Sequence, residues 1–182
     1  MSDLPKNLSR ITLGGGCFWC TEAVFERVKG VHRIESGYCN GHVQQPSYEQ
    51  ICSGNTGHAE VVRLDFDSSE VSLTELLEVF FAIHDPTTLN RQGADIGSQY
   101  RSGIYTHGSE QEAIAREVLA EAQVAHQGRV VTELLPERNY WPAEAYHQRY
   151  YARNPEQGYC AFVVAAKVDK FLSTFARLTR NA

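Results

Sequence analysis

A run of three glycines, Gly14 to Gly16, separates a short apolar segment from a segment with helical spacing. Glycine adopts backbone conformations that other residues avoid, so this run predicts a sharp turn that another molecule can approach closely. Cys17 then lies at the N-terminus of a helix, where the helix dipole and the free N–H groups favour a thiolate. Phe18 and Trp19 follow and can wall an apolar pocket beside the sulfur. The run therefore predicts a strand, a tight turn and a helix, with a reactive thiol at the turn.

The rest of the chain alternates strand and helix patterns within 182 residues, enough for one domain with a sizeable core. Ser72 and Glu75 form a capping pattern that opens one of the helices. The order strand, helix, strand, then strand, helix, strand is that of an α+β ferredoxin-like split βαβ sandwich with additions. Strands are predicted at 10–13, 31–38, 59–66, 101–106 and 130–135, and helices at 18–29, 73–84, 109–126, 143–153 and 168–178.

Two long polar loops, residues 39–57 and 85–99, interrupt this pattern, and the first carries a helical turn at 48–52. Loops of this length inside a compact domain are usually functional. We expect a single catalytic domain over residues 1–182, with long active-site loops, a core at about 10–150 and a C-terminal tail at about 151–182.

Charge and hydropathy limit the partners and the location. There are 22 acidic residues against 17 Lys and Arg, without a dense basic run, which argues against a nucleic-acid partner. No apolar segment approaches the length of a membrane span, and residues 1–10 lack the apolar core of a signal peptide. We therefore expect a cytoplasmic protein that binds neither nucleic acid nor membranes, and nothing demands more than a monomer.

The cysteines are odd in number and lie in a chain without an export signal, which favours redox, catalytic or metal-binding roles over structural disulfides. They are Cys17, Cys20, Cys39, Cys52 and Cys160.

The Cys17-x-x-Cys20 spacing has two further interpretations. It can be a dithiol redox pair, or it can form a Cys₃His zinc site together with Cys39 and His42. A zinc site has no use for two adjacent aromatic residues, and a bound metal would blunt the nucleophile. We therefore expect no metal. Cys160, in a loop with Gly and Pro, can be inert or can reach Cys17 as a resolving thiol.

Three polar residues in or beside the long loops are candidates for binding and proton transfer. Glu60 stands at the start of a predicted strand in an otherwise apolar stretch. It is either a surface carboxylate or, if buried near Cys17, a general acid with a raised pKa that also opposes ionisation of the thiol. Tyr100 and Asp95 suit the binding of a polar oxygen and a peptide N–H, although turn residues alone also explain their loop.

Four short motifs, in order and at compatible spacing, resemble the type A peptide methionine sulfoxide reductases. The resemblance extends from about residue 11 to about residue 160. It implies reduction of the S epimer of methionine sulfoxide, free or in oxidised proteins, to methionine, without a cofactor. The motifs are Gly16-Cys17-Phe18-Trp19, Gly57-His58-Ala59-Glu60, His84-Asp85-Pro86-Thr87 and Gln99-Tyr100-Arg101-Ser102.

The resemblance also implies roles for the site residues. Cys17 attacks the sulfoxide sulfur and becomes a sulfenic acid, while Glu60 protonates the sulfoxide oxygen. Tyr48 and Tyr100 hydrogen-bond to that oxygen. Phe18 and Trp19 surround the substrate methyl group, and Asp95 orients the substrate.

The resemblance further implies that Cys160 resolves Cys17 and that thioredoxin reduces the resulting disulfide. Cys20 stands where many relatives carry glycine, so it competes for the same role. We favour Cys160 because of the resemblance and because a C-terminal tail is expected to be mobile. Cys39 and Cys52 are interpreted as core or loop thiols.

Overall fold

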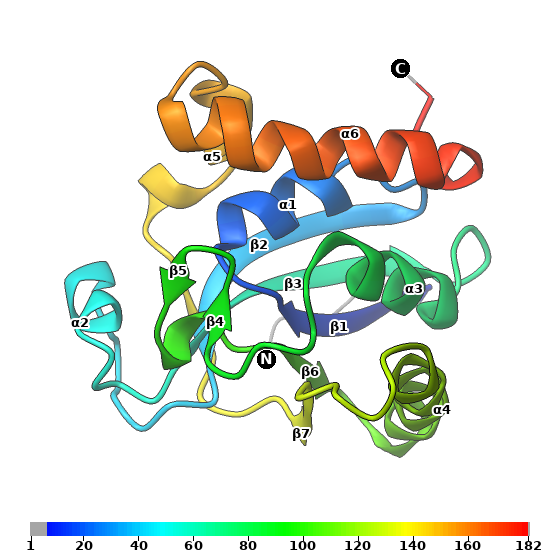
Figure 1. Cartoon of the computed structure of the whole chain (residues 1–182), viewed down its shortest axis with the longest axis horizontal. Coiled ribbons are helices and arrows are strands. Elements are labelled where there is room, and N and C mark those ends of the chain that lie inside the picture. The colour runs from blue at the N-terminus through cyan, green and yellow to red at the C-terminus, as the bar shows by residue number, and fades with distance from the viewer. Residues whose placement is uncertain (1–6, 182) are drawn as a thin grey trace.

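The computed structural model describes residues 7–181, and residues 1–6 and 182 lie outside it. Residues 1–6 belong to the N-terminal segment that is expected to lack a signal-peptide core. Six strands form one sheet in the order β7-β6-β1-β3-β2-β8 (Figure 1). The strands are β1 (Leu8–Gly14), β2 (Val31–Cys39), β3 (Ala59–Asp67), β6 (Gly103–Thr106), β7 (Glu133–Pro136) and β8 (Trp141–Pro142).

The inner part of the sheet has the expected split βαβ order. Strands β6, β1, β3 and β2 are neighbours and pair antiparallel, while β7 joins β6 in parallel and β8 joins β2 antiparallel. The α+β prediction is therefore confirmed, with β7 and β8 as the additions.

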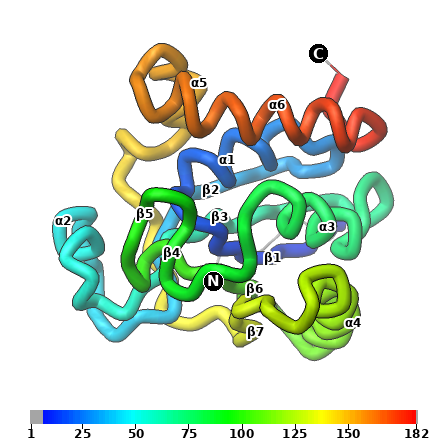
Figure 2. Tube along the Cα trace, viewed as in Figure 1, coloured from blue at the N-terminus to red at the C-terminus, as the bar shows by residue number. Residues whose placement is uncertain are grey.

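Helices cover one face of this sheet. Figure 2 shows α1 and α3 in front of the sheet, with α6 crossing over α1 and α4 lying beyond α3. Among the described residues, no helix has both the length and the apolar character needed to cross a bilayer. The helices are α1 (Phe18–Phe25), α2 (Tyr48–Cys52), α3 (Leu73–Ile83), α4 (Ser109–Ala125), α5 (Tyr150–Arg153) and α6 (Ala165–Thr174).

Strand β3 shows how sequence alternation sets the two faces. Val62, Leu64 and Phe66 are buried in the main core under the helices. Arg63 and Asp65 point to the other face, where Arg63 pairs with Glu137 (2.6 Å) and Asp65 with Arg10 (2.7 Å). Glu60 has the parity of the apolar residues, so its carboxyl lies on the helix-covered face.

Two local predictions are confirmed in detail. The Ser72 hydroxyl accepts a hydrogen bond from the Glu75 backbone N–H, and the Glu75 carboxyl accepts one from the Ser72 backbone N–H, which opens α3. The helical turn expected at residues 48–52 is α2, and it begins at a similar capping box.

The predicted helix over residues 143–153 is wrong. A 3₁₀ turn, Ala145–His147, is followed by Arg149 in the left-handed region (φ 55°), and only Tyr150–Arg153 is helical. The Gln148 side chain explains the break, because it hydrogen-bonds to both the N–H and the C=O of Ser36 on β2. Tertiary hydrogen bonds thus override the local helical pattern.

The expected strand at 130–135 and the last helix are shifted. Only Glu133–Pro136 pairs with β6, because Val131 instead donates its N–H to the carbonyl of Pro86. The last helix, expected at 168–178, begins earlier: a π-helical turn over Cys160–Val164 leads directly into α6.

The long loops meet at one end of the sheet. The loop at 85–99 contains a small hairpin, β4 (Arg91–Gln92) and β5 (Asp95–Ile96), followed by a 3₁₀ turn over Ser98–Tyr100. Figure 1 shows this hairpin, α2 and α5 on the side of the molecule where α1 begins. The glycine turn, both loops and the C-terminal segment therefore converge on Cys17.

Candidate active site

Cys17 is the N-cap residue of α1, as the glycine run predicts. Gly16 has φ +94°, and a Cβ at this position would lie 2.6 Å from the Gln92 side chain, so only glycine fits. The Cys17 thiol is half-buried. Loss of water contact, and then the nearby Glu60 charge, raise its pKa well above the ordinary value, although the Trp19 N–H acts in the opposite direction. Burial thus outweighs the expected effect of the helix N-terminus, and the raised pKa favours the protonated Cys17 thiol in the substrate-free protein.

Glu60 is buried, with 2% of its surface exposed. Its Oε1 accepts a hydrogen bond from the backbone N–H of Phe18 (3.3 Å), the residue that follows the nucleophile. Burial raises the pKa of this carboxyl to about 8, and the negative charge of Asp95 adds to the effect. Glu60 therefore carries a proton at neutral pH and can donate it.

Tyr48 and Tyr100 come from different loops and face the same carboxyl. Both phenols are half-buried. Burial and the Glu60 charge contribute to raising the pKa of each above its ordinary value. The backbone N–H of Tyr48 donates to Glu144 Oε2 (3.0 Å), which fixes the start of α2. Glu60 and Tyr100 lie near enough to Cys17 for their charges to act on it, and Tyr48 lies near Glu60 and Tyr100, so the three offer a set of donors suited to binding and protonating an oxygen atom.

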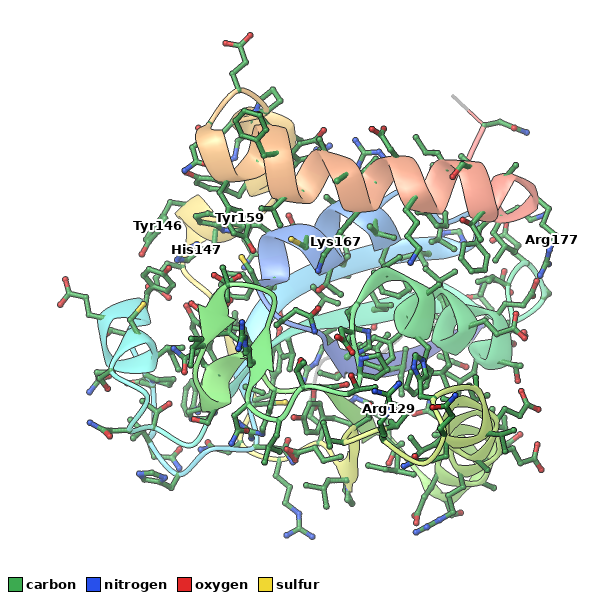
Figure 3. All side chains as sticks on the ribbon, viewed as in Figure 1. Arg129, Tyr146, His147, Tyr159, Lys167 and Arg177 are labelled. Carbon is green, nitrogen blue, oxygen red and sulfur yellow. The ribbon has the colours of Figure 1, made fainter. Side chains whose placement is uncertain are left out.

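Phe18 and Trp19 form an aromatic wall together with residues from the C-terminal part of the chain. Trp19 donates its indole N–H to His147 Nδ1 (3.1 Å) and stacks on Tyr150, with ring centroids 3.8 Å apart and planes at 6°. The Phe18 and Tyr48 rings also contact His147, at centroid distances of 5.1 Å and 4.4 Å. In Figure 3, His147 lies with Tyr146 and Tyr159 on the side where α1 begins.

Asp95, at the start of β5, is linked to α1 through Tyr159. The Tyr159 hydroxyl donates to Asp95 Oδ2 (2.7 Å) and lies 3.8 Å from the Cys20 sulfur. The sequence pattern did not single out Tyr159 or His147. The position of Tyr159 next to Cys160 was the available signal, whereas His147 lay within a segment expected to be an ordinary helix.

Cys160, expected in a mobile C-terminal tail, lies in a π-helical turn rather than in a loop. Its side chain is fully buried at the start of that turn. Cys20 is buried in α1, one helical turn from Cys17. Burial raises the pKa of the Cys20 thiol, while the ammonium of Lys167 and the Tyr159 hydroxyl lower it. All five cysteines are free thiols.

The family model for peptide methionine sulfoxide reductase matches residues 9–179. The chain belongs to the peptide methionine sulfoxide reductase family. It is 51% identical over 174 residues to peptide methionine sulfoxide reductase MsrA of Acinetobacter baumannii, covering 96% of this chain and all of that relative. The chain is accordingly an oxidoreductase.

Solved structures agree with this assignment. Mxr1 from Saccharomyces cerevisiae in its reduced form superposes with a TM-score of 0.81 at 35% identity, covering 86% of this chain and 91% of Mxr1. Mxr1 in complex with Trx2 gives a TM-score of 0.58 at 26% identity, covering 82% of this chain and 89% of Mxr1.

The motifs that mark the reductase family lock together in the fold. Arg101 donates from Nη2 to the carbonyl of Gly57 (2.9 Å) and pairs through Nε with Glu133 (2.5 Å). His84 contacts the Ser102 hydroxyl through Nε2 (2.8 Å) and packs close to Gly15. These contacts hold the loop ends that carry Glu60 and Tyr100 beside the glycine turn.

Other residues of the reductase serve the scaffold. His58 accepts from the Gly41 N–H at Nδ1 and donates from Nε2 to the Val43 carbonyl, so it is a structural hydrogen-bonder. Cys39 is buried beside Tyr105 on the helix-free face of the sheet, and Cys52 is exposed at the end of α2. Both are core or loop thiols, as expected.

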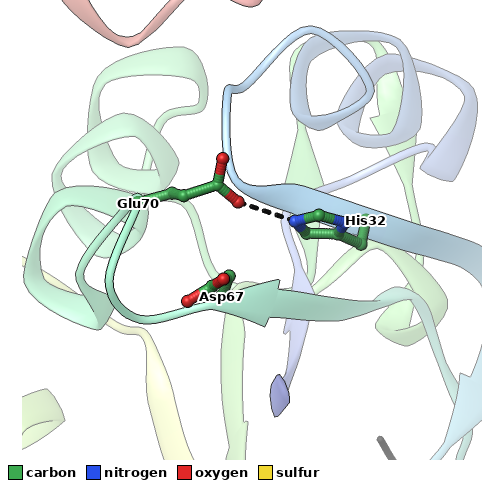
Figure 4. A group of neighbouring side chains, drawn as sticks. All are labelled: His32, Asp67 and Glu70. Atoms are coloured by element: carbon green, nitrogen blue, oxygen red, sulfur yellow. Dashed lines mark hydrogen bonds and ion pairs between the residues drawn. The ribbon is translucent and has the colours of Figure 1, made fainter. Parts of the chain in front are cut away.

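The alternative zinc site does not form. Cys17, Cys20, Cys39 and His42 are all described, and their ligand atoms do not come together. Within residues 7–181, the side chains close enough to share a cation are His32, Asp67 and Glu70 (Figure 4). They lie at the surface, where His32 Nε2 bonds to Glu70 Oε2 (2.7 Å) and Asp67 Oδ1 accepts from Ser69.

Proposed function

We propose that this reductase converts the S epimer of methionine sulfoxide, in proteins and as the free amino acid, to methionine through a Cys17 sulfenic acid. The observation that carries the proposal is the buried, protonated Glu60, hydrogen-bonded to the N–H of the residue after Cys17, with Tyr48 and Tyr100 near the same carboxyl. A sulfoxide oxygen leaves sulfur poorly until it is protonated, so the nucleophile requires an acid beside it.

The first step balances with these groups alone. Tyr48 and Tyr100 hydrogen-bond to the sulfoxide oxygen, and Glu60 transfers its proton to that oxygen. The Cys17 sulfur attacks the sulfoxide sulfur to form an S–S bond, and the thiol proton returns to the Glu60 carboxylate. The hydroxyl then passes from the substrate sulfur to the Cys17 sulfur as the S–S bond breaks, which leaves a Cys17 sulfenic acid and releases the thioether as methionine. Cys17 is oxidised by two electrons and the sulfoxide is reduced by two.

The aromatic wall supports a preference for one epimer. Phe18 and Trp19 lie on one side of Cys17 and take the methyl group, while the three oxygen groups take the sulfoxide oxygen on another. Asp95 accepts from a substrate N–H and orients the rest of the molecule. Three fixed contacts around a chiral sulfur accept only one configuration.

We further propose that an intramolecular disulfide resolves the sulfenic acid and that thioredoxin reduces it. The solved complex of Mxr1 with Trx2 supports thioredoxin as the reductant. Cys17 is the N-cap of α1 and Cys20 lies in the first turn of that helix, close enough for the charge of one thiol to act on the other. Cys160 is fully buried in the π-helical turn, and its thiol lies near that of Cys20. Cys20 is therefore our proposed first partner, with condensation of its thiol and the sulfenic acid releasing water.

The test is turnover of the separated epimers of methionine sulfoxide by the purified protein with dithiothreitol or with thioredoxin, thioredoxin reductase and NADPH. Only the S epimer should be consumed, and Cys17→Ser should abolish the reaction. Equal consumption of both epimers, or turnover by Cys17→Ser, would refute the proposal. The cytoplasmic location and the monomeric state expected from the sequence belong to the same proposal.

A further inference from the structure

Four consecutive residues, His147 to Tyr150, each contact α1 or β2. His147 accepts the Trp19 indole N–H and Tyr150 stacks on the same indole. Gln148 bonds through its side chain to both backbone groups of Ser36 (2.9 Å each). Arg149 pairs with Glu26 (2.8 Å), which follows α1. The contacts of His147 and Tyr150 hold the Trp19 indole. Those of Gln148 and Arg149 attach the segment itself to β2 and to the end of α1.

A buried carboxyl lies beneath this segment. Glu22, one turn along α1 from Trp19, is 2% exposed and has no place in the proposed chemistry. It accepts from the Ser36 hydroxyl (2.8 Å), and the backbone N–H groups of Arg149 and Tyr150 are directed toward it. Glu22 thus joins α1, β2 and the segment at one point.

The segment also contains two energetically costly features. Arg149 has φ 55°, a conformation that non-glycine residues rarely adopt and that persists only where neighbouring contacts impose it. His147 is 1% exposed, and its Nε2 has no hydrogen-bond partner among the residues that the structure describes. Because Nδ1 accepts from Trp19, neutral His147 must carry its proton on Nε2. Burial lowers the pKa of His147, which favours this neutral form.

We propose that residues 147–150 form a clamp that fixes the orientation of the Trp19 indole and thereby sets the selectivity of the site for a methyl substituent on the sulfoxide. The clamp residues are positioning residues, since they act through Trp19. The proposed selectivity for a methyl substituent rests on the function proposed above. The fixed orientation of the Trp19 indole does not depend on that function.

The first test uses the indole N–H signals of the ¹⁵N-labelled reduced protein without substrate. The chain has two tryptophans, and Trp141 donates to Asn139 (2.7 Å), which makes it an internal reference. His147→Asn places an acceptor oxygen near the position of Nδ1, whereas His147→Gln places its amide farther out and leaves Trp19 without an acceptor. We expect His147→Gln to shift the Trp19 signal upfield and to broaden it, and His147→Asn to retain the wild-type position. An unchanged Trp19 signal in His147→Gln overturns the clamp, as does an equal shift of both signals, which reports general unfolding.

The second test compares KM and kcat for methyl p-tolyl sulfoxide and ethyl p-tolyl sulfoxide. One lost orienting hydrogen bond is expected to change binding about 3- to 10-fold. His147→Gln should raise KM for the methyl compound by that factor, lower the methyl-to-ethyl preference and leave kcat within about 2-fold. His147→Asn should restore both values. A loss confined to kcat, or a loss that His147→Asn does not restore, overturns the positioning role. The indole signals are measured without turnover. The first test therefore remains decisive even where the second shows that the proposed function is wrong.

Discussion

The backbone N–H of Phe18 donates a hydrogen bond to Glu60 Oε1 across 3.3 Å. This contact joins the proposed acid on β3 to the residue beside the nucleophile. One N–H favours the carboxylate but does not offset its burial, so the pKa of Glu60 remains at about 8. Protonation of Glu60 also removes a negative charge from the neighbourhood of Cys17. The protonation state of Glu60 and the ionisation of the Cys17 thiol are therefore linked.

The first prediction concerns the acid. Glu60→Gln retains a hydrogen-bonding side chain but has no proton to transfer, so kcat/KM should fall about 100-fold or more. In the wild type, kcat/KM should decline as pH rises through about 8, because Glu60 loses its proton there. The variant should lack this decline. The measurement is kcat/KM from pH 5.5 to 9.5, and an unchanged high-pH limb in Glu60→Gln would assign that limb to another group.

The second prediction concerns stability. The ordinary pKa of a Glu carboxyl is 4.5, and that of folded Glu60 is about 8. Between these values the folded protein keeps a proton that the unfolded chain releases, so the contribution of Glu60 to stability is full below pH 4.5 and is lost as pH rises through 8. Glu60→Gln should therefore gain stability relative to the wild type from pH 4.5 to 8, with no further gain above.

Urea unfolding at pH 4.5, 6.5 and 8.5 measures this difference. Glu22→Gln is the matched control, because burial raises the pKa of Glu22 to about 7. Its relative gain should have the same sign and should end near pH 7. A pH-independent difference for Glu60→Gln would mean that folding does not raise the pKa of the Glu60 carboxyl.

The fold was predictable where local chemistry and tertiary contacts agree. Ser72 and Glu75 cap α3 in the structure as they do in the sequence pattern, and the alternation along β3 matches its two faces. Residues 143–153 show the opposite case. Their helical spacing is real, but the bonds from Gln148 to Ser36, 112 positions away, impose another path. A pattern of local spacing contains no information about such a distant partner.

Which residues form the site was predictable from the sequence motifs. How the surrounding residues pack against them was less predictable. The positions of Glu60 and Tyr100 beside Cys17 follow from short motifs whose loop ends Arg101 and His84 tie together. The burial of Cys160 was not predictable, because a Gly- and Pro-bearing segment reads as a loop until its packing against α1 is known. Tyr159 was missed for the same reason.

The third prediction separates the two phenols. Tyr48→Phe and Tyr100→Phe each remove one donor aimed at the sulfoxide oxygen and leave the ring in place, so each should lower kcat about 10- to 100-fold. KM should change less, because the oxygen gains most of its negative character in the transition state. Steady-state kinetics with free S-methionine sulfoxide provides the measurement. A rise in KM with constant kcat would show that the hydroxyl only binds the substrate.

The fourth prediction identifies the partner of Cys17. One equivalent of methionine sulfoxide is added to the reduced protein without a reductant, and the disulfide is located by mass spectrometry after proteolysis. We expect a Cys17–Cys20 disulfide, since these residues lie one helical turn apart while Cys160 is held in the core.

Two variants decide whether that disulfide is the kinetically relevant one. Cys20→Ser should accumulate the Cys17 sulfenic acid, detectable by trapping with dimedone, and should slow thioredoxin-dependent turnover at least about 10-fold. Cys160→Ser should form the Cys17–Cys20 disulfide at the wild-type rate, because its thiol takes no part in that step. Rapid formation of Cys17–Cys160 in the wild type, with normal turnover in Cys20→Ser, would contradict the assignment.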